Sequence, residues 1–286
     1  MARKSSESGQ IVLIVLLVVV FAVAVGLSLI GRTTENVSIS SQLDESGMAL
    51  SAAEAGITQA IMSVSGSVEP GPVSPGSNQY YDVKKSEIGN VQTYKLPEKT
   101  PNGQLAIVWL NTHNTDGTLS EDKSTEYGGG SLDVCWSLDE NPAIVTSLFF
   151  KRGSTYLVGK GAYGKVIGRD DRFDNVDNPD GSGTNCGVSG VYRKRITFSD
   201  LGFTATDVLL ALRMRPLYAV GGAQFYLQAP PGSLVPLQGN RYVSTGTVKE
   251  SGTENATTRV VQVDRVYSAP SSLFDYVIYS QNNFSQ

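Results

Sequence analysis

The sequence predicts an α+β protein in which one long N-terminal helix precedes a β-rich, mostly antiparallel head. An uncharged apolar run fills residues 11–30, and a helical pattern continues from it to about residue 65. Short β-prone segments bounded by turn residues then follow to the C-terminus. We expect a basic leader at 1–9, a helix at 10–65 and a head at 70–286.

The composition excludes several functional classes. The chain has 286 residues, enough for one large domain or two smaller ones. Its 23 basic and 27 acidic residues give a net charge of −4, so there is no basic surplus for binding nucleic acid. The chain has a single histidine, His113, and two cysteines, which exclude His-rich metal sites and CxxC pairs.

The apolar run at 11–30 has the length of a membrane-spanning helix. Twenty residues rising 1.5 Å each cover about 30 Å, the thickness of a hydrocarbon core. Arg3 and Lys4 precede the run, while Arg32 and Glu35 follow it, so the charge bias predicts an N-terminus inside and a head outside the cytoplasmic membrane. The expected anchor residues are Ile11, Val12, Leu13, Ile14, Leu17, Phe21, Leu27 and Ile30.

A cleaved secretory signal is the alternative interpretation of this run. Ala22-Val23-Ala24 fits the small-residue pattern of a signal peptidase site. The apolar stretch nevertheless continues through Leu27, Leu29 and Ile30, and a helical pattern follows it instead of the start of a new domain. We therefore favour a retained anchor over cleavage after Ala24.

The helix is predicted to continue beyond the membrane as an amphipathic stalk. Apolar side chains recur every seven residues, and this spacing predicts one face that packs against the head. A stretch rich in Gly and Pro ends the pattern, which gives a rod of about 80 Å. A plain signal anchor with a stalk helix has the same pattern. The expected packing residues are Leu43, Leu50, Ile57, Ile61 and Val64.

The N-terminal residues resemble type IV pilin-like proteins. The likeness rests on a basic leader ending in Ser8-Gly9, on Gln10 with the apolar helix, and on the run SQLDESGMALSAAEAGITQAI at 41–61. It is closest to PilX-type minor pilins and GspK-like pseudopilins, whose helices carry a similar Ala-Glu-Ala signature. The resemblance implies cleavage between Gly9 and Gln10 by a prepilin peptidase. It also implies assembly with other pilins on an inner-membrane platform.

One position departs from the major pilins. They usually carry glutamate at the fifth residue after the cleavage site, where this chain has Ile14. PilX-type and GspK-like proteins also lack that carboxylate, so the resemblance implies a minor pilus or pseudopilus subunit, with the filament tip as one location. A membrane-anchored adhesion module that keeps its leader and enters no filament is the alternative.

The head is predicted to be built from short strands separated by Gly, Asn or Asp. A loop near 170–190 would divide it into two subdomains. The apolar segment Leu273–Tyr279 is expected to be a final strand or edge that returns to the core, with a contact surface for a neighbouring pilin as the alternative. The expected strands are 91–96, 105–110, 132–138, 143–151, 155–158, 165–167, 223–228, 241–248 and 259–267, with a further alternating segment around Leu210, Leu212 and Met214.

A glycine-rich run at 157–166 matches the kinase pattern GxGxxGxV and nearly matches a Walker A loop. The H-R-D and D-F-G motifs are missing from the sequence, and Val166 stands where a Walker A loop needs Ser or Thr. We therefore predict a β-hairpin turn with glycines at positive φ, and no nucleotide. Because no serine lies in a GxSxG elbow, we expect the chain not to be an enzyme.

Two further features of the head concern metal binding and oxidation. Asp174, Asp177 and Asp180 lie in a loop whose carboxylates would suit Ca²⁺, although their spacing fails the EF-hand pattern and favours a solvated turn. We expect no other cofactor. Cys135 and Cys186 would pair in an exported chain, stabilising it by about 3 to 4 kcal/mol, and two buried thiols are the alternative.

Overall fold

The computed structural model describes residues 8–63, 68–138, 141–165, 173–249 and 256–269. It divides the chain into two compact units, which we call unit 1 and unit 2. Unit 1 holds residues 1–85 and 242–263, and unit 2 holds 86–241 and 264–286. The predicted α+β class is confirmed.

Unit 1 contains the long helix α1, Ser8–Met62, which has 55 residues. Its N-terminal half is long and apolar enough to cross a membrane. The helix predicted from the sequence ended at residue 65, whereas α1 ends at Met62 in the structure. Residues 1–7 and 64–67 lie outside the described part of the chain.

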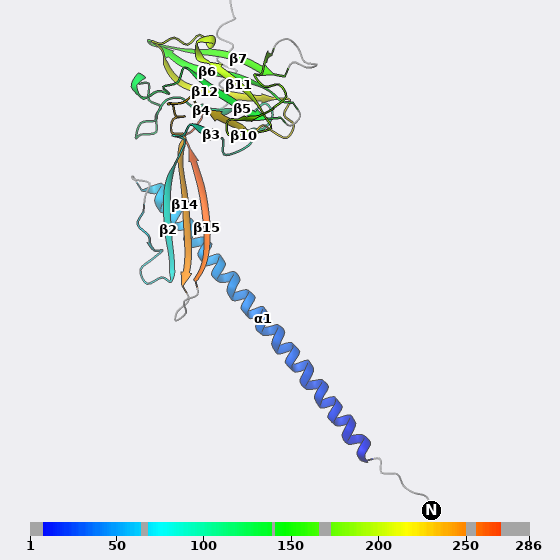
Figure 1. Cartoon of the computed structure of the whole chain (residues 1–286). Coiled ribbons are helices and arrows are strands. Elements are labelled where there is room, and N and C mark those ends of the chain that lie inside the picture. The colour runs from blue at the N-terminus through cyan, green and yellow to red at the C-terminus, as the bar shows by residue number, and fades with distance from the viewer. Residues whose placement is uncertain (1–7, 64–67, 139–140, 166–172, 250–255, 270–286) are drawn as a thin grey trace, which may run out of the picture. The chain divides into compact units, whose positions relative to one another are not determined.

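The sheet of unit 1 has the strand order β1-β2-β14-β15, and Figure 1 shows its three long strands beside the C-terminal part of α1. A small core joins sheet and helix through Ile57, Ala60, Tyr81, Val83 and Tyr242. The strands are β1 Gly71–Pro72, β2 Gln79–Ile88, β14 Gly239–Lys249 and β15 Ala256–Val266.

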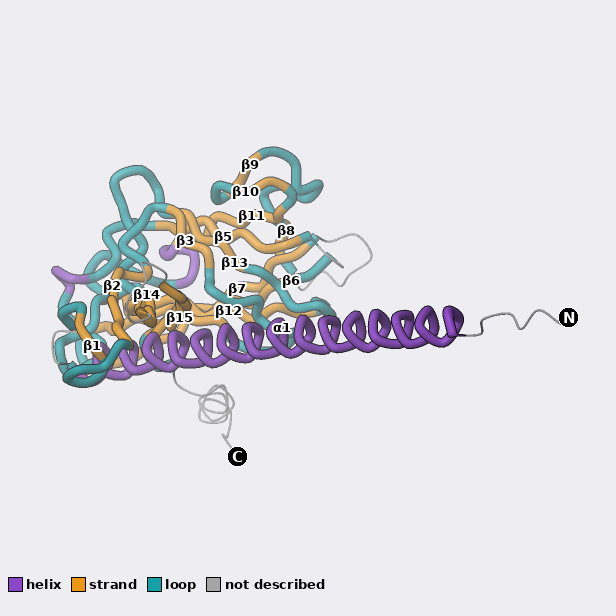
Figure 2. The backbone as a smooth tube through the Cα atoms, turned by 90° about the horizontal axis from the view of Figure 1, so that it is seen from below, coloured by secondary structure: helices purple, strands orange, loops and turns teal. Residues whose placement is uncertain are grey.

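Unit 2 contains two larger sheets (Figure 2). One has the antiparallel order β11-β5-β13-β3, and the other has the order β4-β12-β6-β7-β8, with only β7 and β8 parallel. Their elements are β3 Thr93–Lys95, β4 Ala106–Trp109, β5 Ser131–Ser137, β6 Ala143–Arg152, β7 Thr155–Gly164, β8 Asp174–Asn175, β11 Val191–Thr197, β12 Val208–Leu217 and β13 Phe225–Gln228. Unit 2 also contains the hairpin strands β9 Thr184–Asn185 and β10 Val188–Ser189 and the 3₁₀ turns η1 Lys123–Thr125 and η2 Phe198–Leu201.

The core of unit 2 is one continuous cluster of buried side chains from both sheets. Alternation explains which side chains enter it, because Leu148 and Phe150 of β6 are buried between less buried neighbours. Trp136 of β5 and Phe225 of β13 are fully buried in the same cluster. The two sheets therefore share one apolar interior.

Most predicted strands of the head coincide with observed ones, but β2 and β11 were missed. Both carry runs of charged residues that obscure the alternation of apolar side chains. The C-terminal segment Leu273–Tyr279, predicted as a final strand or edge, lies outside the described residues.

Candidate functional site

The predicted cleavage site and anchor both lie on α1. Gly9 and Gln10 belong to its first turn. From Val12 to Ile30, every large apolar side chain on α1 is more than half exposed. A continuous apolar surface of this length needs lipid or other apolar helices to cover it.

The predicted packing stripe of the stalk is wrong at two of its members. Leu43 is 67% exposed and Leu50 is 43% exposed, so neither packs on the sheet. Ile57 is buried and Ile61 packs against the small core, as expected, while Val64 lies outside the described residues. The buried face consists mainly of small residues three or four positions apart, namely Ala49, Ala52, Ala53, Gly56 and Ala60.

Close approach of the backbones explains why this face is made of small residues. A Cβ placed on Gly246 of β14 would lie 1.9 Å from the carbonyl oxygen of Ala49 and 2.4 Å from the backbone nitrogen of Ala53. A Cβ on Gly56 would lie 2.6 Å from Oγ of Ser244. The helix therefore rests directly on the strand, where a leucine would force the two apart.

Polar contacts also join α1 to the sheet of unit 1. The Thr257 hydroxyl donates to Oε2 of Glu45 at 2.8 Å, and Nε of Arg259 donates to Oγ of Ser46 at 2.7 Å. Both acceptors lie one turn before the alanine face. Small residues and polar contacts together hold one side of the helix against β14 and β15. The second half of α1 is thus an integral part of unit 1.

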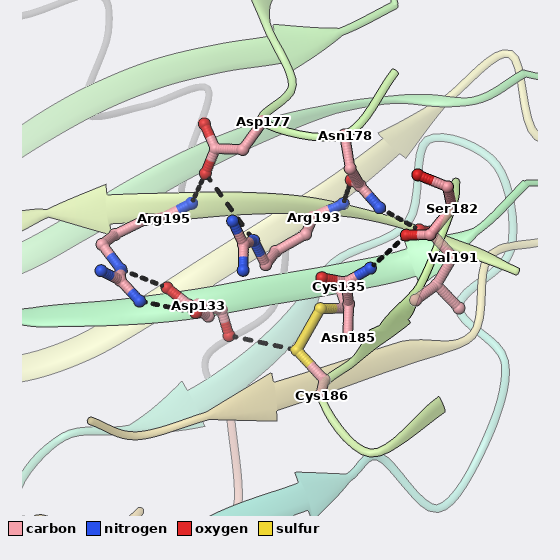
Figure 3. Close-up of a disulfide and its surroundings, with 10 residues drawn as sticks. All are labelled: Asp133, Cys135, Asp177, Asn178, Ser182, Asn185, Cys186, Val191, Arg193 and Arg195. Atoms are coloured by element: carbon pink, nitrogen blue, oxygen red, sulfur yellow. Dashed lines mark hydrogen bonds and ion pairs between the residues drawn. A yellow bond between two sulfur atoms is a disulfide. The ribbon is translucent and has the colours of Figure 1, made fainter. Parts of the chain in front are cut away.

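The two cysteines form a disulfide in unit 2 (Figure 3). Cys135 lies in β5, and Cys186 lies in the turn between β9 and β10. Both are buried and pack with Val191 in a small cluster of their own. The bridge attaches the β9–β10 hairpin to the first sheet.

Charged pairs on the same sheet account for the missed strand β11. Arg195 pairs with Asp133 across the β11–β5 ladder, its Nε donating to Oδ1 at 2.7 Å and Nη2 to Oδ2 at 3.1 Å (Figure 3). This contact raises the pKa of Arg195 above its ordinary value. The backbone N–H of Arg195 donates to Asp177 at 2.8 Å, and Lys194 lies 3.5 Å from the same carboxylate.

The structure does not bring the predicted calcium ligands together. Asp177 is occupied by the basic residues of β11, as described above. Asp180 accepts hydrogen bonds from the backbone N–H and hydroxyl of Ser182, which lower the pKa of its carboxyl, as in an ordinary Asx turn. Within the described ranges, no three His, Cys, Asp or Glu residues form a metal-binding group, so the hypothesis for Asp174, Asp177 and Asp180 is not supported.

The glycine-rich run is part of a strand, which corrects the predicted hairpin turn. Gly159, Gly161 and Gly164 lie in β7, and none of them has a positive φ. The turn lies earlier, at Gly153, where φ is +61°. A Cβ on Gly159 would lie 2.0 Å from the carbonyl oxygen of Leu201, so close packing, not turn geometry, requires glycine there.

The sequence contained a signal for the alanine face of α1. The AlaAlaGluAlaGly run at 52–56 supplies three of its small residues, Ala52, Ala53 and Gly56. The heptad of larger apolar residues is more conspicuous in the sequence, and it predicts a packing face that includes Leu43 and Leu50.

In the comparisons with known proteins, no family model matches the chain, and no curated protein is significantly similar to it.

Proposed function

We propose that the chain is a pilin-like filament subunit, a minor component of a type IV pilus or related pseudopilus that is cleaved after Gly9. The observation that carries the proposal is the construction of α1. Its first half, Val12–Ile30, presents large apolar side chains that the described chain does not cover, and its second half is built into unit 1. The resemblance of residues 1–65 to PilX-type and GspK-like proteins supports the same proposal.

This construction suits a subunit that moves from a membrane into a filament. The apolar half of α1 is stable in lipid, and it stays covered if it exchanges lipid for the apolar faces of other helices. Unit 1 holds the end of the helix through backbone contact with Gly246, so a force on the head is transmitted to the anchor. The partners would be other pilins, a prepilin peptidase and an inner-membrane assembly platform.

The absence of a carboxylate at Ile14 bears on position in the filament. An unpaired charge in the apolar part of the helix would be costly, and residues 11–30 contain none. The first turns of the helix therefore have no charge that a neighbouring subunit in the filament would need to pair. This favours the tip of the filament, where no further subunit lies above.

The mature N-terminus tests this proposal. We expect the intact mass and N-terminal sequence of the protein from its native membrane fraction to start at Gln10. A start at Val25 would mean a secreted protein released by signal peptidase. An intact start at Met1 or Ala2 would mean a permanent anchor, the form expected of an adhesion module. Either result would overturn the proposal.

A matched pair of variants makes the test specific. Gly9→Leu should retain the leader, because it changes the residue before the expected cut. Gly31→Leu lies in the same helix, where a Cβ would meet no atom within 4 Å, and it should be cleaved normally. Loss of cleavage in both variants would point to a general effect on membrane insertion instead of recognition of Gly9.

A further inference from the structure

A groove of about 370 Å³ opens in unit 2, within the range of volumes found for ligand sites. It lies beside β4, the edge strand of the second sheet. Apolar and aromatic side chains form much of its wall, and those used below are Tyr94, Leu96, Ile107, Trp109 and Tyr267. The proposed filament function, which depends on α1, uses none of them.

The pairing of β4 shows which of its backbone groups face away from the sheet. The strand pairs residue by residue with β12. Just beyond it, the N–H of Leu110 donates to the carbonyl of Leu210 at 2.9 Å. Hydrogen-bonded and non-hydrogen-bonded pairs alternate along an antiparallel ladder, so the N–H and C=O groups of Ile107 and Trp109 point to the outer edge.

The contact of Gln238 with Trp109 shows which chemistry this edge binds. Oε1 of the buried Gln238 accepts from the N–H of Trp109 at 2.8 Å, and Nε2 donates to the carbonyl of Trp109 at 2.9 Å. A primary amide carries its oxygen and an N–H side by side, as one residue of an extended chain carries its C=O and N–H. The side-chain amide thus takes the place of a neighbouring strand.

The next outward position on the same edge, Ile107, is open. It lies two residues from Trp109, which is about 7 Å along a strand. Within the described part of the chain, no hydrogen bond is formed by the N–H or C=O of Ile107. A free pair of this kind at a sheet edge is a template for an extended peptide residue, which satisfies both groups at once.

Stacking holds the aromatic part of the wall in place. The ring of Tyr267 lies nearly parallel to the ring of His113, with centroids 3.7 Å apart. The ring of His113 in turn meets Trp109 edge to face at 4.9 Å. Rings fixed in this way provide apolar contact without the entropy loss of ordering them on binding.

Tyr94 adds a hydrogen-bond donor to the groove. The residue is only 7% exposed, and its hydroxyl forms no hydrogen bond within the described ranges. Burial, followed by the negative charge of Asp264, raises the pKa of Tyr94 to about 12, so the hydroxyl stays protonated. It can therefore donate to a carbonyl oxygen of a ligand.

The charged residues of the wall favour an uncharged ligand. They are Glu98, Lys99 and Asp264. The carboxylate of Asp264 accepts two hydrogen bonds from Arg241, each at 2.7 Å. Glu98 and Lys99 are neighbours of opposite charge, so the wall has no excess charge with which to attract an ion. A neutral, extended backbone matches both this charge balance and the open edge at Ile107.

We propose that this groove binds an extended, uncharged segment of another polypeptide as an added strand on β4. One residue of the segment exchanges two backbone hydrogen bonds with Ile107, as the Gln238 amide does with Trp109. The Tyr94 hydroxyl donates to a further carbonyl of the segment. Apolar side chains of the segment pack on Leu96 and on the aromatic part of the wall.

Binding of the peptide acetyl-Thr-Val-Thr-Val-Thr-amide to the full chain in detergent micelles tests this proposal. The peptide is uncharged, and its residues favour strands. Its Kd is measured from the fluorescence of Trp109, and its position from amide hydrogen exchange in residues 105–109. We expect a Kd below about 1 mM, and exchange of Ile107 at least about tenfold slower with saturating peptide. The same peptide with every backbone amide N-methylated has no donors and should not bind.

Two variants at the open position make the test specific. Ile107→Pro removes the outward N–H at an edge position where proline is tolerated, whereas Ile107→Val keeps it. We expect the first to weaken binding at least about tenfold and the second to bind like the wild type. Tyr94→Phe keeps the ring and should weaken binding about three- to tenfold, which tests the site independently if Ile107→Pro does not fold.

Three results would overturn the proposal. The first is the absence of saturable binding by the wild type up to about 1 mM peptide. The second is equal binding by the wild type, Tyr94→Phe and a folded Ile107→Pro, which would place the peptide elsewhere. The third is protection of Ile107 in the wild type without peptide, which would mean that the edge is already covered. None of these results depends on cleavage at Gly9, so the test is independent of the proposed filament function.

Discussion

The two units of this protein are stabilised in different ways. In unit 1 the helix contacts the sheet through alanine and glycine, and the core includes only a few larger side chains such as Ile57 and Tyr81. In unit 2 a large continuous cluster fills the space between two sheets, with a disulfide beside it. Substitutions that enlarge a side chain in the helix–sheet contact should therefore destabilise unit 1, and substitutions that shorten a core side chain should destabilise unit 2.

The chain provides separate reporters for this comparison. Both tryptophans, Trp109 and Trp136, lie in unit 2, so tryptophan fluorescence follows the unfolding of that unit. Amide hydrogen exchange of residues 242–249 of β14 follows the unfolding of unit 1. A substitution can then be assigned to one unit by the reporter that it changes.

The largest effect is expected from Trp136→Ala. The ring is fully buried, and its Nε1 donates to the carbonyl of Pro142 at 3.0 Å. Its loss should lower the free energy of unfolding of unit 2 by about 4 kcal/mol, measured by denaturant titration of Trp109 fluorescence. The control Leu234→Ala, at a half-exposed position, should change it by less than about 0.5 kcal/mol. A loss below about 1 kcal/mol for Trp136→Ala would contradict a shared core.

Removal of the disulfide should have the next largest effect. The cysteines are 51 residues apart, so the double variant Cys135→Ala/Cys186→Ala should lose about 3 kcal/mol from the chain-entropy effect. The loss should appear in tryptophan fluorescence and leave exchange in β14 unchanged. Mass spectrometry after alkylation without reductant should show no modified cysteine in the wild type. Alkylation of both thiols would mean that they are unpaired.

Local pattern was sufficient for the central strands of unit 2. The strand expected at 143–151 is observed as Ala143–Arg152, because its alternating apolar residues match the two faces of a sheet. Strand β11 was missed because Arg193, Lys194 and Arg195 interrupt that pattern. The charge of Arg195 is paired with the carboxylate of Asp133, which lies far away in the chain. The local sequence around β11 does not show this pairing.

The helix face could not be chosen correctly from its own sequence. Leucines at heptad spacing are the usual sign of a packing face, and Leu43 and Leu50 fit that pattern. The face that packs is selected by Gly246, whose missing side chain admits the backbone of α1 near Ala53. Because this partner lies in the last quarter of the chain, only the folded structure shows that small residues form the contact.

Two glycine-to-alanine substitutions test this contact in unit 1. Gly246→Ala should destabilise the helix–sheet contact by about 2 kcal/mol, because the new methyl would lie 1.9 Å from the carbonyl oxygen of Ala49. Gly47→Ala introduces the same methyl in α1 where no atom lies within 4 Å, and should stabilise the helix by about 0.5 to 1 kcal/mol. Exchange in β14 should accelerate in the first variant and slow or stay constant in the second. Effects of the same sign would contradict close contact at Gly246.

The smallest effect is expected from Asp207→Asn, which tests whether acid sensitivity is confined to unit 2. The buried Asp207 carboxylate accepts two hydrogen bonds from Arg152, each at 2.7 Å, and one from the backbone N–H of Thr204. The Arg152 hydrogen bonds lower the pKa of Asp207 below its ordinary value of 3.8. Because Arg152 is 46% exposed, we expect a loss of only about 1 to 2 kcal/mol at neutral pH.

The pH dependence of this loss has a definite sign. A carboxyl whose pKa is lowered by folding stabilises the protein above its ordinary pKa, and this contribution disappears as the pH falls below about 4. The stability difference between wild type and Asp207→Asn should therefore be largest at neutral pH and shrink on acidification. Exposed Asp116, replaced by Asn, is the control and should leave the fluorescence midpoint nearly unchanged. A difference that grows at low pH, or that appears in β14 exchange instead of fluorescence, would mean that Asp207 does not act through Arg152 within unit 2.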